Sequence, residues 1–461
     1  MNKKTITLTF YGGAETVTGA NFLLEGILEE EKKLRLLVDC GMEQGDKFCK
    51  DCNFDKFQYS PSDIDVLIVT HAHMDHIGRI PQLVRLGFKG VIYSTDATRA
   101  LSAIMLEDAS HIIALEAKKA KREPIYKAHD VKSALELWKG VPYQRSTELP
   151  YGFSFKLKDA GHVLGSAIIE VKYGEKRIVF TGDLGNSPSP LLRDSEIITD
   201  ADYLVMESVY GDRNHETKND RVHMLKNVIE ETIRNKGVLL IPAFSIERTQ
   251  VLLYELNEMI ESGSLPHIPV YLDSPLAIRV TQIYKRYTSL FKESIQEQIR
   301  KGDNIFDFPK LTFTEHQKDS EGIASKSSPK IIIAGSGMSH GGRIINHEKR
   351  YLSSNMNTLL FIGYQAAGSL GRKIQDGLKK IHIEDKSITI RANIRTISGY
   401  SAHKDMDGLV EFVEGMAENV QKVFVTMGEP KASLFLAQRL REYLDVSAIV
   451  PKKDERVILN M

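Results

Sequence analysis

The stretch Asp65-Val-Leu-Ile-Val-Thr70-His71-Ala-His73-Met-Asp75-His76 decides the fold and the chemistry of this chain. Its first half is an apolar, β-branched run of the kind that forms a buried strand. Its second half places three histidines and an aspartate within six residues, where the strand gives way to a loop. His71 and His73 lie two positions apart, so extended backbone directs both side chains to one side.

These residue types indicate a metal site. Imidazole and carboxylate ligands without a thiolate favour Zn(II), and Mn(II) or Fe(II) are also compatible. Asp75 and His76 lie at the turn into the next helix and can face a point beside the one that His71 and His73 face. The pattern therefore predicts up to two adjacent metals with a position open for water. A solvated histidine-rich loop is the alternative.

The composition is that of an average folded protein. The chain has 461 residues, 42% hydrophobic and 26% charged, and this length predicts more than one domain. Lys plus Arg and Asp plus Glu both number 61, so any nucleic-acid site must be local. No apolar run reaches the roughly 18 residues of a membrane span, and no signal peptide precedes the first strand pattern. We expect a soluble, cytoplasmic protein without a membrane partner.

The three cysteines are too few for a disulfide framework in a chain of this size, so reduced thiols are expected. Cys49 and Cys52 have C-x-x-C spacing, and Cys40 lies nearby. A small metal or redox site is conceivable there, but no further cysteine completes four zinc ligands. We prefer a purely structural role.

The pattern along the chain predicts an α/β protein in which one domain interrupts another. Short strands dominate residues 1–207, β and α patterns alternate over 208–384, and the earlier pattern returns over 385–461, beginning with a strand at 387–392. An alternating pattern is typical of a parallel sheet, so we interpret the middle part as an insertion. The polar, Lys/Ser-rich stretch 317–328 is expected to be a solvated connection rather than a site.

The histidine-rich run resembles the HxHxDH motif of the metallo-β-lactamase superfamily, and three further residues match that family's pattern in order. Asp39 matches the acidic residue that orients ligands from behind, His162 the third histidine of the first metal, and Asp183 the carboxylate that bridges both metals. The resemblance implies an αββα sandwich. It also implies one metal at His71, His73, His162 and Asp183 and a second at Asp75, His76 and Asp183.

The middle of the chain resembles the β-CASP domain of nucleic-acid-cleaving members of that superfamily. Glu207, in Glu207-Ser-Val-Tyr-Gly211, looks like the first acidic motif of the subfamily, and His403, in Ser398-Gly-Tyr-Ser-Ala-His403, looks like its histidine motif. The resemblance extends through residues 242–250, 273–277, 335–343 and 363–372. It is closest to bacterial and archaeal relatives of the endonuclease subunit of eukaryotic pre-mRNA cleavage and polyadenylation, a ribonuclease group.

This resemblance implies a zinc-dependent ribonuclease, endo- or exonucleolytic, that acts on single-stranded RNA. The predicted catalytic residues are Asp75, Glu207 and His403. A carboxylate such as Glu207 fixes the orientation of His403, which could then protonate the leaving sugar oxygen. Glycine-rich turns and arginines offer donors to phosphates, and the substrate-binding candidates are Arg248, Ser336, Gly337, Arg343 and Arg372.

One residue departs from the family pattern. The last motif normally supplies a histidine ligand of the second metal, and this chain has Met427 there. A thioether is a soft, weak donor for Zn(II) or Mn(II), so we expect the second site to bind its metal weakly. A catalytically impaired RNA-binding or scaffold protein is the alternative, and a small-molecule metallo-hydrolase is less favoured. The sequence leaves open a homodimer, the RNA preference and the cleavage mode.

Overall fold

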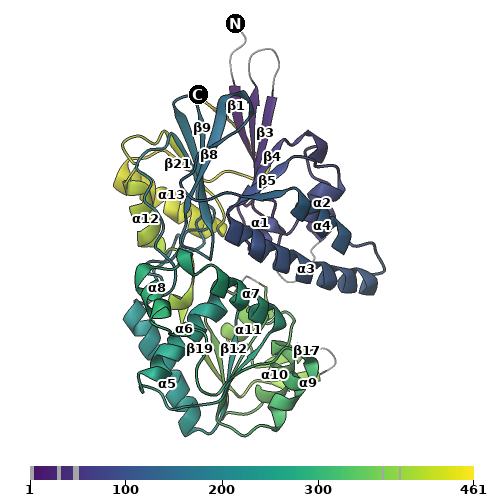
Figure 1. The fold of residues 1–461 in the computed structure, drawn as a ribbon, viewed down its shortest axis with the longest axis vertical. Helices are drawn as coiled ribbons and strands as arrows, with labels where there is room; N and C mark the ends of the chain where they lie inside the picture. The colour runs from purple at the N-terminus through teal and green to yellow at the C-terminus, as the bar shows by residue number, and fades with distance from the viewer. Residues whose placement is uncertain (1–4, 28–32, 45–50, 366–367, 384–385, 461) are drawn as a thin grey trace. The chain divides into compact units, whose positions relative to one another are not determined.

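The structure is a computed structural model that describes residues 5–27, 33–44, 51–365, 368–383 and 386–460. The chain forms two compact units, shown in Figure 1. The first unit includes the described residues up to Asn214 and resumes at His403, and the second contains His215–Ala402. The second unit is therefore an insertion in the first. The predicted domain limits at 207/208 and 384/385 stay predictions.

The first unit contains two sheets that share a core. Along β8 (Phe153–Asp159), Phe153, Phe155 and Leu157 are buried with period two, because successive side chains of a strand point to opposite faces. In the described residues, the first sheet has the order β22 (Arg456–Leu459), β1 (Thr5–Gly12), β2 (Asn21–Ile27), β3 (Lys33–Val38), β4 (Val66–Ile68), β5 (Val91–Ser94), β6 (Trp138–Gly140). The second has β21 (Ala448–Ile449), β20 (Lys422–Val425), β11 (Tyr203–Met206), β10 (Lys176–Phe180), β9 (Ala167–Tyr173), β8 and β7 (Thr147–Glu148).

Helices cover the outer faces of these sheets (Figure 1). On the side of the first sheet lie α1 (Met74–Ile77), α2 (Ile80–Arg85), α3 (Asp96–Lys119) and α4 (Ala128–Glu136). On the side of the second lie α12 (Met406–Glu414) and α13 (Pro430–Leu444), whose Leu409, Phe412 and Leu436 pack with strand residues in a second core. The predicted αββα sandwich is confirmed. In the described part of the chain, no helix is long and apolar enough to cross a membrane.

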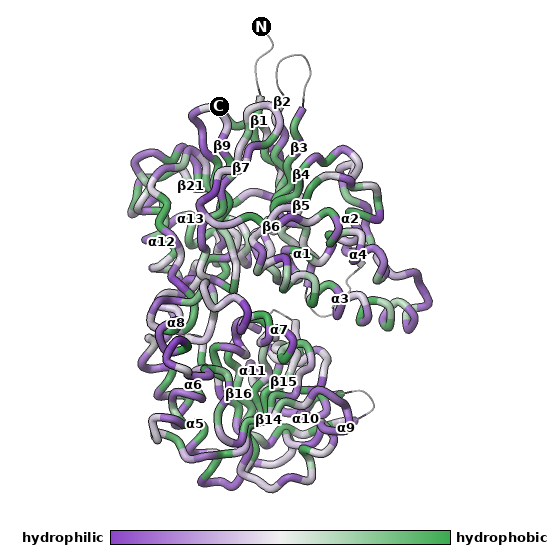
Figure 2. The backbone as a smooth tube through the Cα atoms, viewed as in Figure 1, coloured by the Kyte–Doolittle hydropathy of each residue, from purple (hydrophilic) through white to green (hydrophobic). Residues whose placement is uncertain are grey.

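The second unit is built on a parallel sheet. Every residue of β12 (Val238–Pro242) and β15 (Lys330–Ala334) is buried, as expected for parallel strands covered on both faces, and these strands are green in Figure 2. In the described residues the strand order is β14 (Leu311–Phe313), β13 (Val270–Asp273), β15, β12, β16 (Thr358–Phe361), β19 (Asn393–Thr396). Its helices are α5 (Lys218–Arg234), α6 (Arg248–Glu261), α7 (Pro275–Arg286), α8 (Glu293–Arg300), α9 (Gln317–Gly322), α10 (Ile344–Tyr351) and α11 (Leu370–Gln375).

Two segments differ from their expected structure. The strand expected at 387–392 is β18 (Lys386–Thr389), which pairs with β17 (Lys380–Ile383), and β19 then joins the parallel sheet beside β16. Short strand patterns look alike in any sheet, so sequence alone did not reveal these partners. The stretch 317–328 is not a plain connection, because it forms α9 and a 3-10 turn at Ile323–Ser325. Ser320 of α9 donates a hydrogen bond to the buried Asp273, which explains its order.

Candidate metal centre

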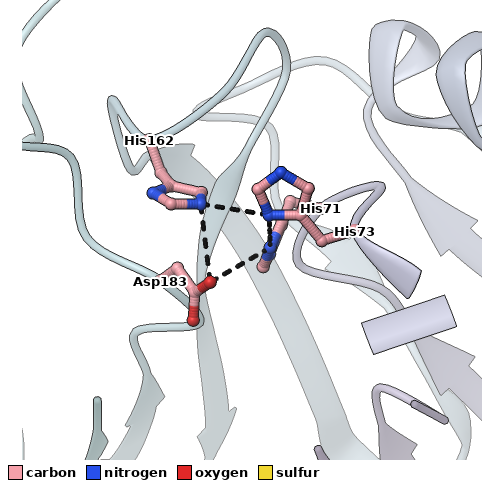
Figure 3. A group of neighbouring side chains, drawn as sticks. All are labelled: His71, His73, His162 and Asp183. Atoms are coloured by element: carbon pink, nitrogen blue, oxygen red, sulfur yellow. Dashed lines mark hydrogen bonds and ion pairs between the residues drawn. The ribbon is translucent and has the colours of Figure 1, made fainter. Parts of the chain in front are cut away.

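The candidate ligands lie at strand ends of the first unit. β4 leads into His71 and His73, and His76 lies on α1, which begins directly after His73. On the second sheet, His162 lies in the loop between β8 and β9, and Asp183 follows β10. Figure 3 shows the side chains of His71, His73, His162 and Asp183 pointing toward one another. Residues far apart in sequence thus meet at one point.

Four ligand atoms lie within 4.8 Å of one another, close enough to hold one metal. His73 Nδ1 lies 3.1 Å from His71 Nε2 and 3.2 Å from His162 Nε2. Asp183 Oδ2 lies 3.3 Å from His71 Nε2 and 3.4 Å from His162 Nε2. Tetrahedral ligands at about 2.0–2.1 Å from a zinc ion are themselves about 3.3 Å apart. These residues therefore fit one metal.

The second predicted group is also close together. His76 Nε2 lies 3.3 Å from Asp183 Oδ1 and 3.9 Å from Asp75 Oδ2. His76 Nε2 and Asp183 Oδ1 are buried, and neither has a hydrogen-bond partner in the described residues, although the two atoms lie 3.3 Å apart. Buried polar atoms without partners are costly unless a cation or water satisfies them. Two orphaned ligand atoms that face each other fit a second metal.

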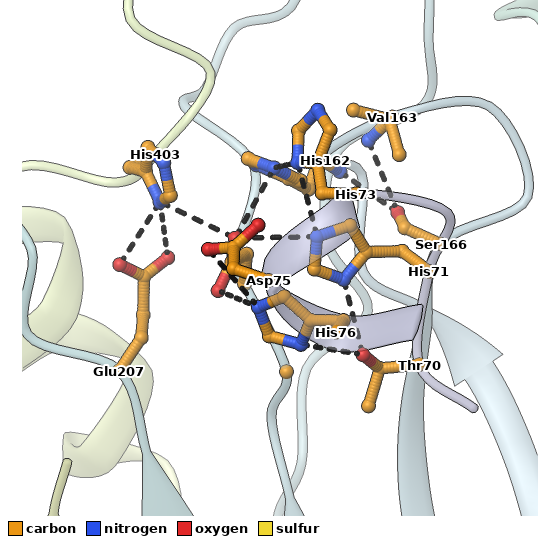
Figure 4. A network of polar contacts seen from close by, with 12 residues as sticks. Thr70, His71, His73, Asp75, His76, His162, Val163, Ser166, Glu207 and His403 are labelled. Carbon is orange, nitrogen blue, oxygen red and sulfur yellow. Dashed lines mark hydrogen bonds and ion pairs between the residues drawn. The ribbon is translucent and has the colours of Figure 1, made fainter. Parts of the chain in front are cut away.

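Asp39 and Thr70 orient the imidazoles from behind. Asp39 accepts hydrogen bonds from the Thr70 amide at 2.8 Å and the Thr70 hydroxyl at 2.7 Å, and its Oδ2 lies 2.7 Å from His76 Nδ1. Thr70 Oγ1 lies 3.0 Å from His71 Nδ1, as Figure 4 shows. With both Nδ1 atoms protonated, His71 and His76 would present their Nε2 atoms to bound metals. The resemblance indicated Asp39, whereas sequence reasoning missed Thr70, whose only signal is its place directly before His71.

The loop that carries His162 is fixed through its backbone. Ser166 Oγ accepts hydrogen bonds from the amides of His162 at 3.0 Å and Val163 at 3.2 Å (Figure 4). At the end of the loop, the Thr95 and Thr98 hydroxyls donate to the Gly165 carbonyl at 2.7 and 2.8 Å. Sequence reasoning also missed Ser166, because a serine four residues after a ligand has no distinctive spacing.

The electrostatics favour bound cations. Burial lowers the pKa of His162 and of His71, so that both rings are neutral and can offer a lone pair. Burial alone would raise the pKa of Asp183, but the charge of His76 holds it well below its usual value. Conversely, burial would lower the pKa of His76, yet the Asp183 and Asp39 carboxylates raise it well above 6.5. The buried carboxylates therefore favour a positive charge beside them, which a divalent cation would supply.

Glu207 and His403 form a pair beside the ligands. His403 Nδ1 lies 3.1 and 3.2 Å from the two carboxylate oxygens of the buried Glu207, and Glu207 Oε1 accepts from the Leu184 amide at 2.7 Å. A β-bridge between Gly185 and His403 ties the histidine to the loop that carries Asp183. His403 Nδ1 is 3.9 Å from Asp183 Oδ2. Asp183, Glu207 and His403 are close enough to share an ion, so position alone fits either a ligand or a proton donor.

Met427 occupies a constrained position in the core. Its thioether lies so close to Gly13 that a Cβ there would be 2.6 Å from the sulfur, and the residue packs with Phe22 in the core between the sheets. Its backbone is left-handed, with φ of 47°. The Met427 amide donates to the Gly13 carbonyl at 2.6 Å, and the Met427 carbonyl accepts from Ser208. The thioether therefore serves packing, and its proposed effect on the second metal stays a prediction.

The five substrate-binding candidates lie in the second unit. Arg248 begins α6 and is buried. Ser336 Oγ accepts from the His340 amide at 3.1 Å, within a loop that bends back on itself, and a Cβ on Gly337 would clash with Phe244 at 2.7 Å.

Arg343 and Arg372 already have carboxylate partners. Arg343 donates to Asp273 at 2.8 Å and to the Thr314 carbonyl at 2.7 Å, and Arg372 donates to Asp376 at 3.1 Å. The structure thus gives a local role to four of the candidates and places Arg248 in a buried position. Binding of substrate by these five residues stays a prediction.

The cysteines offer no described metal site. Cys49 lies outside the described residues, so the C-x-x-C hypothesis stays untested there. Cys40 and Cys52 are free thiols. Burial raises the pKa of Cys40 to about 12, so that it remains protonated and unreactive.

Comparisons with known proteins confirm the resemblance. Three family models match: the metallo-beta-lactamase superfamily at residues 26–214, the Beta-Casp domain at 249–374 and the Zn-dependent metallo-hydrolase RNA specificity domain at 387–451. Together with the relatives below, these matches show that the chain belongs to the β-CASP group of the metallo-β-lactamase superfamily. Family membership and the ligand cluster together identify a divalent-metal site.

Three similar relatives cover most of the chain. Ribonuclease TTHA0252 of Thermus thermophilus is 36% identical over 93% of this chain and 95% of its own. An RNase J-like protein of Methanocaldococcus jannaschii is 32% identical over 97% and 98%. Transcription termination factor FttA of Methanosarcina mazei is 30% identical over 96% and 70%. A solved protein of unknown function from Enterococcus faecalis matches 99% of this chain and 100% of its own, with a TM-score of 0.55 and 12% identity. This similarity shows the fold alone.

Proposed function

We propose that this chain is a metal-dependent ribonuclease that hydrolyses phosphodiester bonds of single-stranded RNA. The observation that carries the proposal is the cluster of ligand atoms at His71, His73, His162 and Asp183 beside the Glu207–His403 pair. One place then combines cation binding with a positioned proton donor. Relatives named as ribonucleases match over nearly the whole chain, and the RNA specificity domain model supports RNA as the substrate.

The first metal would bind His71, His73, His162 and Asp183, and the second Asp75, His76 and Asp183. Nitrogen and carboxylate ligands favour Zn(II), with Mn(II) or Fe(II) as compatible occupants. When bound, such metals polarise a scissile phosphate and lower the pKa of water.

The side chains supply orientation and proton transfer. Glu207 holds His403 through Nδ1, which leaves Nε2 on the opposite side of the ring to protonate the departing sugar oxygen. The Asp75 side chain is 18% exposed, so its carboxylate can accept a proton from the attacking water. Asp39 and Thr70 keep the ligand rings in the tautomer that the metals need. If the protein binds RNA at these residues but does not cleave it, the chain is an RNA-binding scaffold.

The test is cleavage of a 5′-labelled single-stranded RNA by protein of known metal content. We expect one metal to resist mild chelation and a second to be lost first, with cleavage stopping on full chelation and returning when Zn(II) is added. A metal-loaded protein that binds RNA without cutting it would establish the scaffold alternative. Two metals of equal chelator resistance would contradict the weakened second site.

Met427→His should tighten binding of the second metal. An imidazole is a far better ligand than a thioether for Zn(II), and histidine tolerates the left-handed backbone of this position better than methionine. Isothermal titration calorimetry of the metal-free protein with Zn(II) should show a stronger second binding event. RNA cleavage at limiting metal should also rise. Met427→Leu, which restores no ligand, is the matched control. Identical titrations for the two variants would mean that residue 427 does not reach the metals.

A further inference from the structure

A hollow of about 810 Å³ lies in the second unit between α9, α10 and β18. Figure 1 shows α9, α10 and the neighbouring β17 at one edge of this unit. We call this hollow the α9–α10 groove. Its charged and titratable lining side chains are Glu321, Arg343, His347, Lys349, Arg350 and Lys386. Positive groups therefore predominate, with Glu321 as the acidic member among the described residues.

The floor of the α9–α10 groove is rigid. Asp273, at the end of β13, is fully buried and accepts hydrogen bonds from Arg343 at 2.8 Å, His347 at 2.7 Å and Ser320 at 2.6 Å. Burial would raise the pKa of Asp273, but hydrogen bonds led by those from His347 and Ser320 lower it strongly, so the carboxylate stays ionised. This single anion ties α9, α10 and β13 together. The groove is therefore formed before any ligand arrives, which lowers the ordering cost of binding.

The rim carries two cations without an acidic partner among the described residues. Arg350 and Lys386 are exposed, and within the described residues neither side chain has a hydrogen bond or an ion pair. Glu321 accepts a hydrogen bond from Gln317 at 2.9 Å. Burial and the charge of Arg350 lower the pKa of nearby Lys330, as expected where positive groups gather. In a chain of zero net charge, such a local excess among the described residues can attract a polyanion.

We propose that the α9–α10 groove binds the phosphodiester backbone of single-stranded RNA, as a contact additional to the metal centre. The inference rests on the proposed ribonuclease function for its ligand class. Guanidinium, ammonium and amide groups of Arg350, Lys386 and Asn346 are donors that phosphate oxygens accept. The described lining holds no Phe, Tyr or Trp on which bases could stack, so recognition is of charge and not of sequence.

An acidic peptide is the competing ligand class. Peptide recognition usually relies on apolar anchors in pockets or on an open strand edge. The α9–α10 groove offers mainly charged and polar side chains, with Ala324 as its apolar member among the described residues. Phosphate, with its regular spacing of charge and its fit to arginine, suits this lining better.

The test compares two double variants of the full metal-loaded protein. Arg350→Ala/Lys386→Ala removes two charges from the groove rim, and Arg234→Ala/Lys301→Ala removes two from exposed positions of α5 and the end of α8. The probe is a labelled phosphorothioate RNA of about 20 nucleotides, which keeps its backbone charge and resists hydrolysis. Binding is measured by fluorescence anisotropy over a series of salt concentrations, because each phosphate contact contributes about 0.7 to the logarithmic salt slope.

The groove variant should bind about tenfold more weakly than wild type at low salt, and its salt slope should fall by about 1.4, the value for two phosphate contacts. The control variant should keep the wild-type slope, and equal melting temperatures would exclude misfolding. Equal slopes for the two variants would overturn the proposal. The proposal would also be overturned if the groove variant bound a labelled oligoglutamate more weakly than wild type but bound RNA equally well. If RNA binding depends on the groove but the protein cuts no RNA, the ribonuclease function is refuted, and the proposal that the groove binds RNA stands.

Discussion

Asp183→Asn should remove bound metal and RNA cleavage together. Its two carboxylate oxygens face different ligand groups, with Oδ2 3.3 Å from His71 Nε2 and Oδ1 3.3 Å from His76 Nε2. An amide has one neutral oxygen and cannot hold two cations as a carboxylate does. Because metals stabilise the transition state of such reactions by several kcal/mol, we expect cleavage to fall by about a thousandfold or more. Elemental analysis and RNA cleavage by the same sample give both readouts.

A surface aspartate of the same unit gives a matched control. Asp200 is 52% exposed, and its carboxylate forms an ion pair with Arg177 at the protein surface. Asp200→Asn removes the same charge and should leave metal content and cleavage close to those of wild type. If Asp183→Asn loses activity but keeps both metals, the carboxylate acts in the reaction and not as the proposed bridge.

The first candidate metal ligands were predictable because their signal is local. The spacing of His71, His73, Asp75 and His76 after an apolar strand is informative without any tertiary contact. His162 and Asp183 are ordinary turn residues in isolation, and only the family resemblance and their order pointed to them. The structure then brings His162 to 3.2 Å from His73 and Asp183 to 3.3 Å from His71.

The supporting residues were not predictable for a physical reason. Thr70 and Ser166 act through single hydroxyl groups whose partners are fixed by how loops fold onto one another, and serine and threonine occur in most loops. Stretch 317–328 illustrates the same limit, because its polar composition predicts a connection while Ser320 and the buried Asp273 make it ordered. The composition of a segment indicates how polar it is. Whether the segment forms regular structure depends on its contacts with residues elsewhere in the chain.

His403→Ala should separate bond breaking from metal binding. The imidazole contacts Glu207 through Nδ1 at 3.1 Å, whereas the four atoms of the first metal group come from other residues. Loss of a general acid costs about a hundredfold or more, so cleavage should fall by at least that factor while the tight metal and RNA affinity remain. His129→Ala, which removes an exposed imidazole of α4, is the matched control.

The leaving group decides whether His403 donates a proton. A nitrophenolate departs without protonation, so a nitrophenyl ester of a nucleotide should be hydrolysed by His403→Ala at close to the wild-type rate, while Asp183→Asn should fail on both substrates. Glu207→Gln should show the same selective loss to a smaller degree, because an amide orients the ring less strongly than a carboxylate does. Equal losses on RNA and on the ester would refute the general-acid role. Loss of metal from His403→Ala would instead assign His403 as a ligand, which its 3.9 Å distance from Asp183 permits.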